Sequence, residues 1–351
     1  MIKVHTYEIK KPLKLDPEFA FLFENRTTFK FKKYPNKVLR NCFVSNTGVL
    51  LKNYLIPLRS AENLVGSEDH TFYNLHWRKA IEQKIVCRFG KSLQLYTLDS
   101  SNLYYSIHTP WFGYFTWVTS YLPRLLEAVK EYPNAYLLYL EEWDTFPFVR
   151  DSIALFPNLK LQIIPKDHHV DVPNFLFIPC REWTSIFDLD TLNTIRTFFH
   201  ANLDKKQRAS SLPTKVYLSR GKSKRRKVIN EISLEEILFR YGINTVYMED
   251  LSFMDQVSLM NSANLVLSAH GAGLTNIHFM NEGATVIEMT PILKDFNDFR
   301  FPYWRMASLL GLNYYCLFCE TNYTKHFDEY DSDLSVDLIK LISILDTIEK
   351  S

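Results

Sequence analysis

The sequence predicts an α/β protein with two Rossmann-like domains. Three observations predict it: strand-like and helical patterns alternate from residue 213 onward, a continuous apolar run of the buried-strand type occupies Ala135–Leu140, and a polar segment ending in proline, Asp204–Pro213, divides the chain. At 351 residues the chain is long enough for two ordinary domains. We expect residues 1–204 to form an N-terminal domain, 213–330 a C-terminal domain, and 331–351 a terminal helix that packs back.

The C-terminal half alternates regularly, which indicates a parallel, doubly wound sheet. The expected strands are Lys215–Ser219, Asn244–Tyr247, Asn264–Ser268, Thr285–Met289 and Tyr314–Phe318. The expected helices are Leu234–Tyr241, Ser252–Asn261, Leu274–Met280, Trp304–Leu310 and Leu334–Lys350.

The N-terminal half is irregular at first and becomes α/β from about residue 90. The expected strands are Val38–Val44, Gly48–Ile56, Leu93–Leu98, Ala135–Leu140, Leu161–Ile164 and Phe175–Ile178. The expected helices are Phe112–Tyr132, interrupted at Pro123, then Phe148–Phe156 and Asp188–Leu203. The run Phe19–Lys33 mixes five phenylalanines with Lys and Arg. A strand of a meander is the favoured interpretation, and a patch for a membrane or a partner is the alternative.

Composition limits the class of protein. No apolar run reaches 18 residues and Met1–His5 lack the apolar stretch of a signal peptide, so we expect a cytoplasmic protein, with peripheral contact at the inner face of a membrane left open. Five cysteines do not suggest a disulfide framework, and Cys316 and Cys319 lack a second ligand pair. Asp188-Leu189-Asp190 resembles a metal-binding motif but opens a helical pattern, where capping explains it. We expect no metal and no other cofactor.

The segment Ser268–Thr275 follows an apolar strand and precedes a helix. A strand, a turn of small residues and a helix start place bare backbone N–H groups where an anion can bind. Gly271 and Gly273 let a phosphate approach the main chain, and His270 can add a hydrogen bond or a positive charge. A tight turn with purely steric glycines is the alternative.

A basic turn follows the first strand of the C-terminal half. Seven of the thirteen residues in Lys215–Lys227 are Lys or Arg, whereas the whole chain has a net charge of only +2. Such a local excess suggests an anionic partner, although a solvated loop is the usual role of a charge run. Arg220 differs from the rest because it ends the strand, where α/β folds present their ligands, and its fork suits a diphosphate.

These segments resemble glycosyltransferase family 61. The resemblance is carried by Tyr217–Arg220, Arg225–Glu231, Glu249–Phe253, Gln256-Val257, Ser268–Asn276, Gly283–Glu288, Tyr303–Ala307 and Leu310–Leu312. It covers about Pro213–Phe318, with one further stretch, Tyr114–Trp117 and Leu122–Leu125, in the N-terminal half. The family usually carries His where this chain has Thr116 and an acidic residue where it has Ser120.

The resemblance implies a GT-B architecture and an inverting transferase that moves a sugar from a nucleotide-diphosphate donor to a hydroxyl. We expect a bacterial-type enzyme that builds capsule or lipopolysaccharide, with a glycan or lipid-linked glycan acceptor. The chain has cations and a helix start to stabilise the leaving diphosphate but no metal carboxylate pair, which predicts metal-independent catalysis.

The expected site gathers at the carboxyl edge of the parallel sheet. We expect Arg220, Arg225, His270 and the amides of Gly271, Ala272, Gly273 and Leu274 to hold the diphosphate, with Glu249 beside them. Glu288 is expected to bind the ribose, with an ion pair to Arg220 or Arg225 as the alternative. Direct displacement also needs a general base. Thr116 and Ser120 cannot supply it, so His108 and Asp144 are the candidates.

Two other functions remain open. Thr116 and Ser120 suggest a nucleotide-sugar-binding protein without transferase activity. The turn Lys222–Lys227 suggests a protein that binds nucleic acid, although the near-neutral net charge argues against such a partner.

Overall fold

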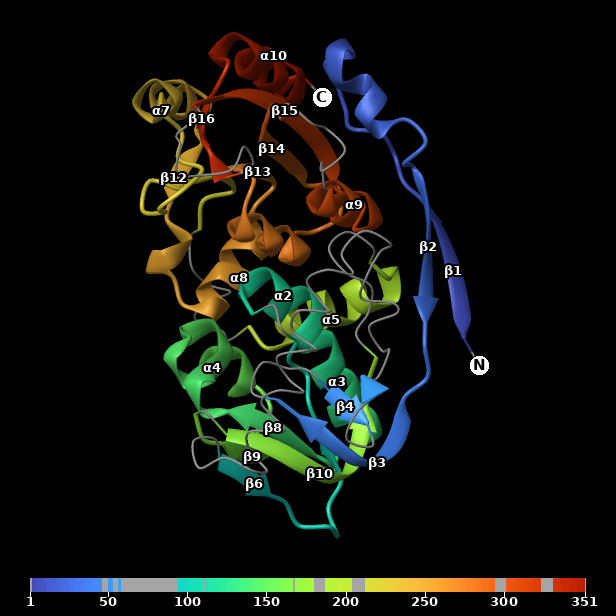
Figure 1. The fold of residues 1–351 in the computed structure, drawn as a ribbon. Helices are drawn as coiled ribbons and strands as arrows, with labels where there is room; N and C mark the ends of the chain where they lie inside the picture. Colours follow the sequence, from blue (N-terminus) through green and yellow to red (C-terminus); the bar gives the residue numbers. More distant parts are fainter. Residues whose placement is uncertain are drawn as a thin grey trace. The chain divides into compact units, whose positions relative to one another are not determined.

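A computed structural model describes residues 2–45, 50–52, 56–57, 94–109, 112–166, 168–179, 187–203, 212–293, 301–322 and 331–350. The chain forms two compact units, each of which combines helices with a sheet (Figure 1). Unit 1 contains Met1–His5 and Phe31–Trp183, and unit 2 contains Thr6–Lys30 and Thr184–Ser351. The expected linker, Asp204–Pro213, lies almost wholly outside the described residues. The α/β class expected from the sequence is confirmed.

Unit 1 is built on a mixed sheet with the strand order β5-β4-β3-β10-β7-β8-β9, and β6 also pairs with β10. Its strands are β3 (Lys37–Val44), β4 (Leu50–Lys52), β5 (Ile56–Pro57), β6 (Gln94–Thr97), β7 (Tyr104–Tyr105), β8 (Tyr136–Leu140), β9 (Lys160–Ile164) and β10 (His168–Phe177). Its helical segments are α2 (Tyr114–Thr116), η3 (Trp117–Tyr121), α3 (Leu122–Glu131), η4 (Glu141–Thr145) and α4 (Pro147–Ile153). β7 to β9 run parallel, and β3 pairs antiparallel with β10.

Unit 2 is built on a sheet with the order β12-β11-β13-β14-β15-β16, parallel except for the last strand. Its strands are β11 (Lys215–Leu218), β12 (Asn244–Val246), β13 (Leu265–Ala269), β14 (Thr285–Pro291), β15 (Asn313–Asn322) and β16 (Asp333–Ser335). Its helical segments are η1 (Pro17–Phe23), α5 (Leu189–Ala201), α7 (Glu231–Arg240), η5 (Met248–Asp250), α8 (Phe253–Ser262), η6 (Ala272–Phe279), α9 (Pro302–Leu309) and α10 (Leu338–Glu349). The parallel, doubly wound arrangement expected here is confirmed.

Both faces of the unit 2 sheet are covered, which explains its continuous apolar strands. One face packs Leu267, Ile287 and Leu317 against α7 and α10. The other face includes Val286 and Glu288, which are also buried. A sheet buried on both sides leaves its carboxyl edge as the place where polar loops gather.

The expected domain boundary differs from the observed units. Residues 6–30 belong to unit 2 because their aromatic side chains pack there: Phe19 stacks on Phe318, and Phe23 meets Trp304 edge-on. α5 also belongs to unit 2, where Phe199 contacts Phe253. Their position in the sequence predicted that both segments belong to the N-terminal domain. They belong to unit 2 instead, because their aromatic side chains are buried there.

The run Phe19–Lys33 is only partly a strand. Its first part forms η1, and its second part forms β2 (Thr28–Lys33), which pairs with β1 (Lys3–Glu8). Four of its five phenylalanines are buried and only Phe21 is exposed. The buried phenylalanines are part of the protein core, which argues against the alternative of a patch for a membrane or a partner. In the described part of the chain, no helix is both long and apolar enough to cross a membrane.

Other expectations met local corrections. Pro123 lies in the first turn of α3, where its missing N–H costs nothing, and the preceding turn widens to the π-helix η3.

The expected final helix from Leu334 begins four residues later, because Asp333–Ser335 pairs with β15 instead. His169 is buried in β10 against Phe43. Cys316 and Cys319 are buried free thiols, as expected.

Candidate functional site

The strand order of unit 2 creates a switch point between β11 and β13. The chain leaves β11, forms β12 on one side, and returns to form β13 on the other side of β11. At such a switch point the loops after the two strands leave in opposite directions, and ligands of open α/β sheets bind at this carboxyl edge. Arg220 follows β11, and His270 and Gly271 follow β13.

The side chain of Arg220 lies directly on the backbone of Gly271. A Cβ atom built on Gly271 would stand 2.9 Å from Cζ of Arg220 and closer still to Nη1. Gly271 has an extended backbone, with φ of 161°, that any residue can adopt. The space that a side chain at position 271 would need is therefore occupied by the guanidinium, and the alternative of a glycine demanded by the turn conformation is not supported.

Arg220 keeps its charge available. Its Nη2 donates to Ser223 Oγ at 2.8 Å and to the carbonyl of Arg225 at 3.2 Å. Among the residues that the structure describes, no carboxylate forms an ion pair with it, and Glu249 is exposed nearby. Burial, and after it the positive charge of Arg226, lower the pKa of Arg220 to about 10. The side chain is thus a half-buried cation at neutral pH without a neutralising carboxylate.

Glu231, at the start of α7, braces the Arg220 turn from behind. Its Oε1 accepts hydrogen bonds from Tyr217 Oη and Ser219 Oγ, both at 2.7 Å. Ser219 Oγ in turn accepts from the Gly221 amide at 3.0 Å. Asn230 precedes the helix, so this pair starts α7 as expected, and Glu231 also shapes the turn.

The Gly271 turn is braced in the same way. Tyr303 Oη donates to the Gly271 carbonyl at 2.7 Å, and Asn276 Nδ2 donates to the Gly273 carbonyl at 3.1 Å. The Leu274 amide also donates to the Gly271 carbonyl, at 3.0 Å, so it is already engaged within the turn, unlike the ligand-binding role expected for it. The amides of Ala272 and Gly273 begin η6, where a helix offers them no internal acceptor.

Arg226, and not Arg225, accompanies Arg220. Arg225 is 52% exposed and pairs with Asp331, which corrects its expected role at the diphosphate. Arg226 is 14% exposed, contacts Asp331 only at 3.6 Å, and leaves a buried Nε without a hydrogen-bond partner. Its backbone is left-handed, with φ of 57°, a conformation rare for a residue with a side chain. Because the two arginines are adjacent in the sequence, their spacing could not predict which side chain is buried.

The remaining cations of the basic turn are partly neutralised. Lys222 Nζ pairs with Asp250 at 2.5 Å and lies 4.8 Å from the ring centroid of Tyr247. With Arg225 held by Asp331, two of the cations expected to attract an anion already have carboxylate partners in unit 2.

Glu288 has protein partners where a ribose was expected. Its carboxylate is paired with His270 Nδ1 and accepts a hydrogen bond from Tyr314 Oη. The alternative, an ion pair to Arg220 or Arg225, is not what the structure shows, because Arg225 pairs with Asp331. The apolar residues that surround Glu288 in β14 predicted that its carboxylate needs a partner but did not identify that partner.

Part of the chain matches a known protein family. The stretch 114–287 matches the family model described as Glycosyltransferase 61. This stretch includes Arg220 and His270, and it also reaches back to the α2–α3 segment of unit 1.

Related sequences carry a more specific name. "Protein O-linked-mannose beta-1,4-N-acetylglucosaminyltransferase 2" of Canis lupus familiaris is 32% identical over 127 residues, which are 34% of this chain and 22% of that protein. The Homo sapiens protein of the same name is 34% identical over 96 residues, 26% of this chain and 16% of that protein. The chain thus aligns with about a fifth of the length of these curated relatives. They are animal proteins named for a protein-linked mannose, and they give no support to the expected bacterial capsule or lipopolysaccharide enzyme.

The Glycosyltransferase 61 match begins at Tyr114, so it includes the two positions where the family pattern differs. Thr116 ends α2, and Ser120 lies in η3. Arg124 braces this segment: its Nε donates to the Ser120 carbonyl at 3.1 Å and its Nη2 donates to the Ile107 carbonyl. These contacts tie the η3–α3 segment to the loop that contains Ile107.

His108 is part of the unit 1 core and does not fit the role of a base. Its Nε2–H donates to the Ser45 carbonyl at 3.1 Å, and its Nδ1 accepts from Ser106 Oγ at 2.5 Å, so both ring nitrogens are engaged. Asp144 is exposed on η4 and accepts from Tyr139 Oη at 2.6 Å. Of the two candidates for the base, Asp144 is therefore the one whose titratable group is exposed.

Two buried histidines predict that the protein loses stability in acid. Burial lowers the pKa of His108 and of His278 to about 4, below the value of about 6.5 for an unfolded chain. Between these values the unfolded state binds more protons, so the free energy of unfolding falls as pH drops from 6.5 to 4, by roughly 1.4 kcal/mol per pH unit for each histidine. Urea unfolding across this range measures the slope. His108→Gln should flatten it, whereas His168→Gln, at a partly exposed site, should not.

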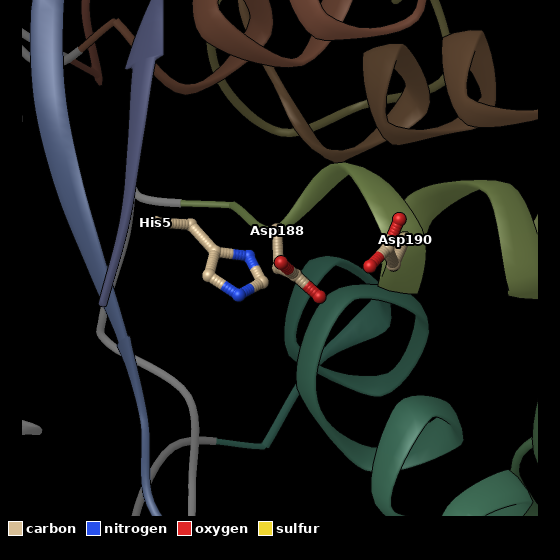
Figure 2. A group of neighbouring side chains, drawn as sticks. All are labelled: His5, Asp188 and Asp190. Atoms are coloured by element: carbon tan, nitrogen blue, oxygen red, sulfur yellow. The ribbon is translucent and has the colours of Figure 1, made fainter. Parts of the chain in front are cut away.

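Asp188 and Asp190 act as a helix start, as expected (Figure 2). Asp188 is the N-cap of α5 and accepts from the Thr191 amide at 3.2 Å and from Thr191 Oγ1 at 2.7 Å. Tyr7 Oη also donates to Asp188, at 2.8 Å. Asp190 lies in the first turn, where a negative charge favours the helix.

Proposed function

We propose that this protein transfers a sugar from a nucleoside diphosphate donor to a hydroxyl group of a glycan. The contact between Arg220 and Gly271 at the switch point of the unit 2 sheet carries the proposal. It brings a guanidinium, without a neutralising carboxylate among the described residues, onto the start of η6, and both features favour a diphosphate. The match to Glycosyltransferase 61 supports the same reaction.

The chemistry follows from where negative charge develops. Breaking the bond between the sugar and the diphosphate places charge on the leaving oxygen. Arg220, Arg226 and the amides of Ala272 and Gly273 would stabilise this charge, with His270 beside them. In this proposal the displacement is direct, inverting and independent of a metal. The acceptor hydroxyl then needs a base, for which Asp144 is the candidate.

Substrates and architecture belong to the same proposal. The names of the relatives make an N-acetylglucosamine donor and a mannose-bearing acceptor the first pair to test. Unit 2 would be the donor-binding domain of a GT-B enzyme, and unit 1 would supply the acceptor-side groups.

Calorimetric titration of the full chain with nucleoside mono- and diphosphates tests donor binding. We expect a diphosphate to bind at least about tenfold more tightly than the monophosphate, since the second phosphate adds charge-assisted hydrogen bonds of about 1.5–3 kcal/mol each. Release of diphosphate from nucleotide sugars, with and without glycan acceptors, tests transfer.

The other outcomes separate the alternatives. Diphosphate binding without transfer across a broad acceptor panel would support a binding protein, as Thr116 and Ser120 suggest. Absence of diphosphate binding, with steeply salt-dependent binding of RNA or DNA, would replace the proposal by nucleic-acid binding.

A further inference from the structure

A chain of three buried polar side chains runs from the site into the sheet. His270 at the end of β13 is paired through Nδ1 with Glu288 of β14, and Glu288 accepts a hydrogen bond from Tyr314 of β15. The three residues are 7%, 4% and 4% exposed, respectively. A carboxylate so deeply buried is costly unless donors satisfy it, and here His270 and Tyr314 both do so.

The direction of each hydrogen bond in this series follows from the protonation of Tyr314 and the charge of Glu288. Burial holds the pKa of Tyr314 well above its usual range, so its hydroxyl stays protonated and donates to Glu288. The other carboxylate contact is made by Nδ1 of His270, which therefore carries a proton. Nε2 lies on the opposite side of the imidazole ring, away from Glu288.

Other groups around His270 bear on its charge. The ring of Tyr303 from α9 lies with its centroid 5.2 Å from that of the imidazole, and burial keeps this phenol protonated by raising its pKa. Arg220 lies on the adjacent Gly271, and the charges of Arg220 and Arg226 both reach Tyr303. The two arginines oppose a positive charge on His270, whereas Glu288 offsets it.

We propose that Glu288 and Tyr314 are positioning residues for His270: they hold its proton on Nδ1 and favour the imidazolium, which makes His270 a pH-dependent cation for the donor diphosphate. This inference rests on the proposed function. Glu288 then acts through His270 and does not bind the ribose, and Tyr314 acts one step further away. Diphosphate affinity should fall as pH rises and His270 loses its charge.

The test is the pH profile of nucleoside diphosphate binding, measured by calorimetry of the full chain from pH 5.5 to 9. We expect Glu288→Gln to move the midpoint of the fall to lower pH by about one to three pH units, because the stabilising anion is lost. Tyr314→Phe should cause a smaller shift in the same direction, and His270→Gln should remove the step. Thr290→Val, at another buried polar side chain of β14, is the matched control and should keep the wild-type profile. Ionisation of the ligand is common to all variants and cancels.

A Glu288→Gln profile that superimposes on the wild-type profile would overturn the inference while leaving the proposed function intact. If the wild type binds no nucleoside diphosphate at any pH, the proposed function fails, and the ¹⁵N resonances of the His270 imidazole become the readout. A proton on Nδ1 in the wild type that moves to Nε2 in Tyr314→Phe or Glu288→Gln would support the positioning role. A proton on Nε2 in the neutral wild-type ring would refute it.

Discussion

Gly271→Ala is expected to weaken nucleoside diphosphate binding by roughly 10- to 100-fold without changing the charge of any residue. The new Cβ would occupy the position of the Arg220 guanidinium. Because that group is the end of a flexible side chain, Arg220 would move and the backbone would stay. The loss would then equal one or two charge-assisted hydrogen bonds of about 1.5–3 kcal/mol each. The melting temperature should change little.

Gly273→Ala is the matched control for this prediction. It adds the same methyl group two residues away in the same turn, but no atom lies within 4 Å of the new Cβ. Its diphosphate affinity and melting temperature should remain close to those of the wild type. Equal losses in both variants would show that the turn needs glycine for its backbone alone, and the contact with Arg220 would lose its assigned role.

Arg220→Ala is expected to weaken diphosphate binding by about 100-fold or more. The substitution removes a half-buried guanidinium whose hydrogen bonds, among the described residues, go to Ser223 and to the Arg225 carbonyl, so we expect the folded chain to lose little stability. A bound diphosphate would lose a bidentate partner. Arg220→Lys keeps the charge but not the planar fork, and an intermediate affinity is expected. Calorimetric titration at fixed salt measures the diphosphate affinity of the wild type and of both variants.

Arg225→Ala provides the control that the sequence alone would have placed in the same class. Its guanidinium pairs with Asp331 at the surface, where an ion pair contributes about 1 kcal/mol or less to stability. Diphosphate affinity should stay within about twofold of the wild type. If Arg225→Ala and Arg220→Ala weaken binding equally, the basic turn acts as a diffuse positive field and not through one positioned arginine.

The doubly wound part of unit 2 was predictable because its signals are local. Strands buried on both faces need continuous apolar runs such as Leu265–Leu267, and parallel strands need a helix between them. The same rules place Arg220 and His270 at one edge of the sheet. The hydrogen bond from Asn276 to the Gly273 carbonyl is a contact of the same local kind, because the two residues are three positions apart.

The errors concern partners that are distant in sequence. Glu288 finds His270 and Tyr314, 18 and 26 residues away, and Arg225 finds Asp331, 106 residues away. His108 is anchored by Ser45, 63 residues upstream, so a histidine in a polar loop became a core residue. Burial and pairing of such groups depend on which strands become neighbours, and that information is spread over the whole chain.

By itself, the sequence determined the α/β class, the alternation in unit 2 and the two segments that carry an anion site, because backbone geometry and hydrophobic periodicity act over a few residues. Only the tertiary structure decided which side chains of those segments meet. It placed Arg220 on Gly271, turned Arg226 inward and Arg225 outward, and gave Glu288 to His270. The reason is physical: a buried charge is tolerated only where a partner of suitable geometry is present, and the fold brings that partner from elsewhere in the chain.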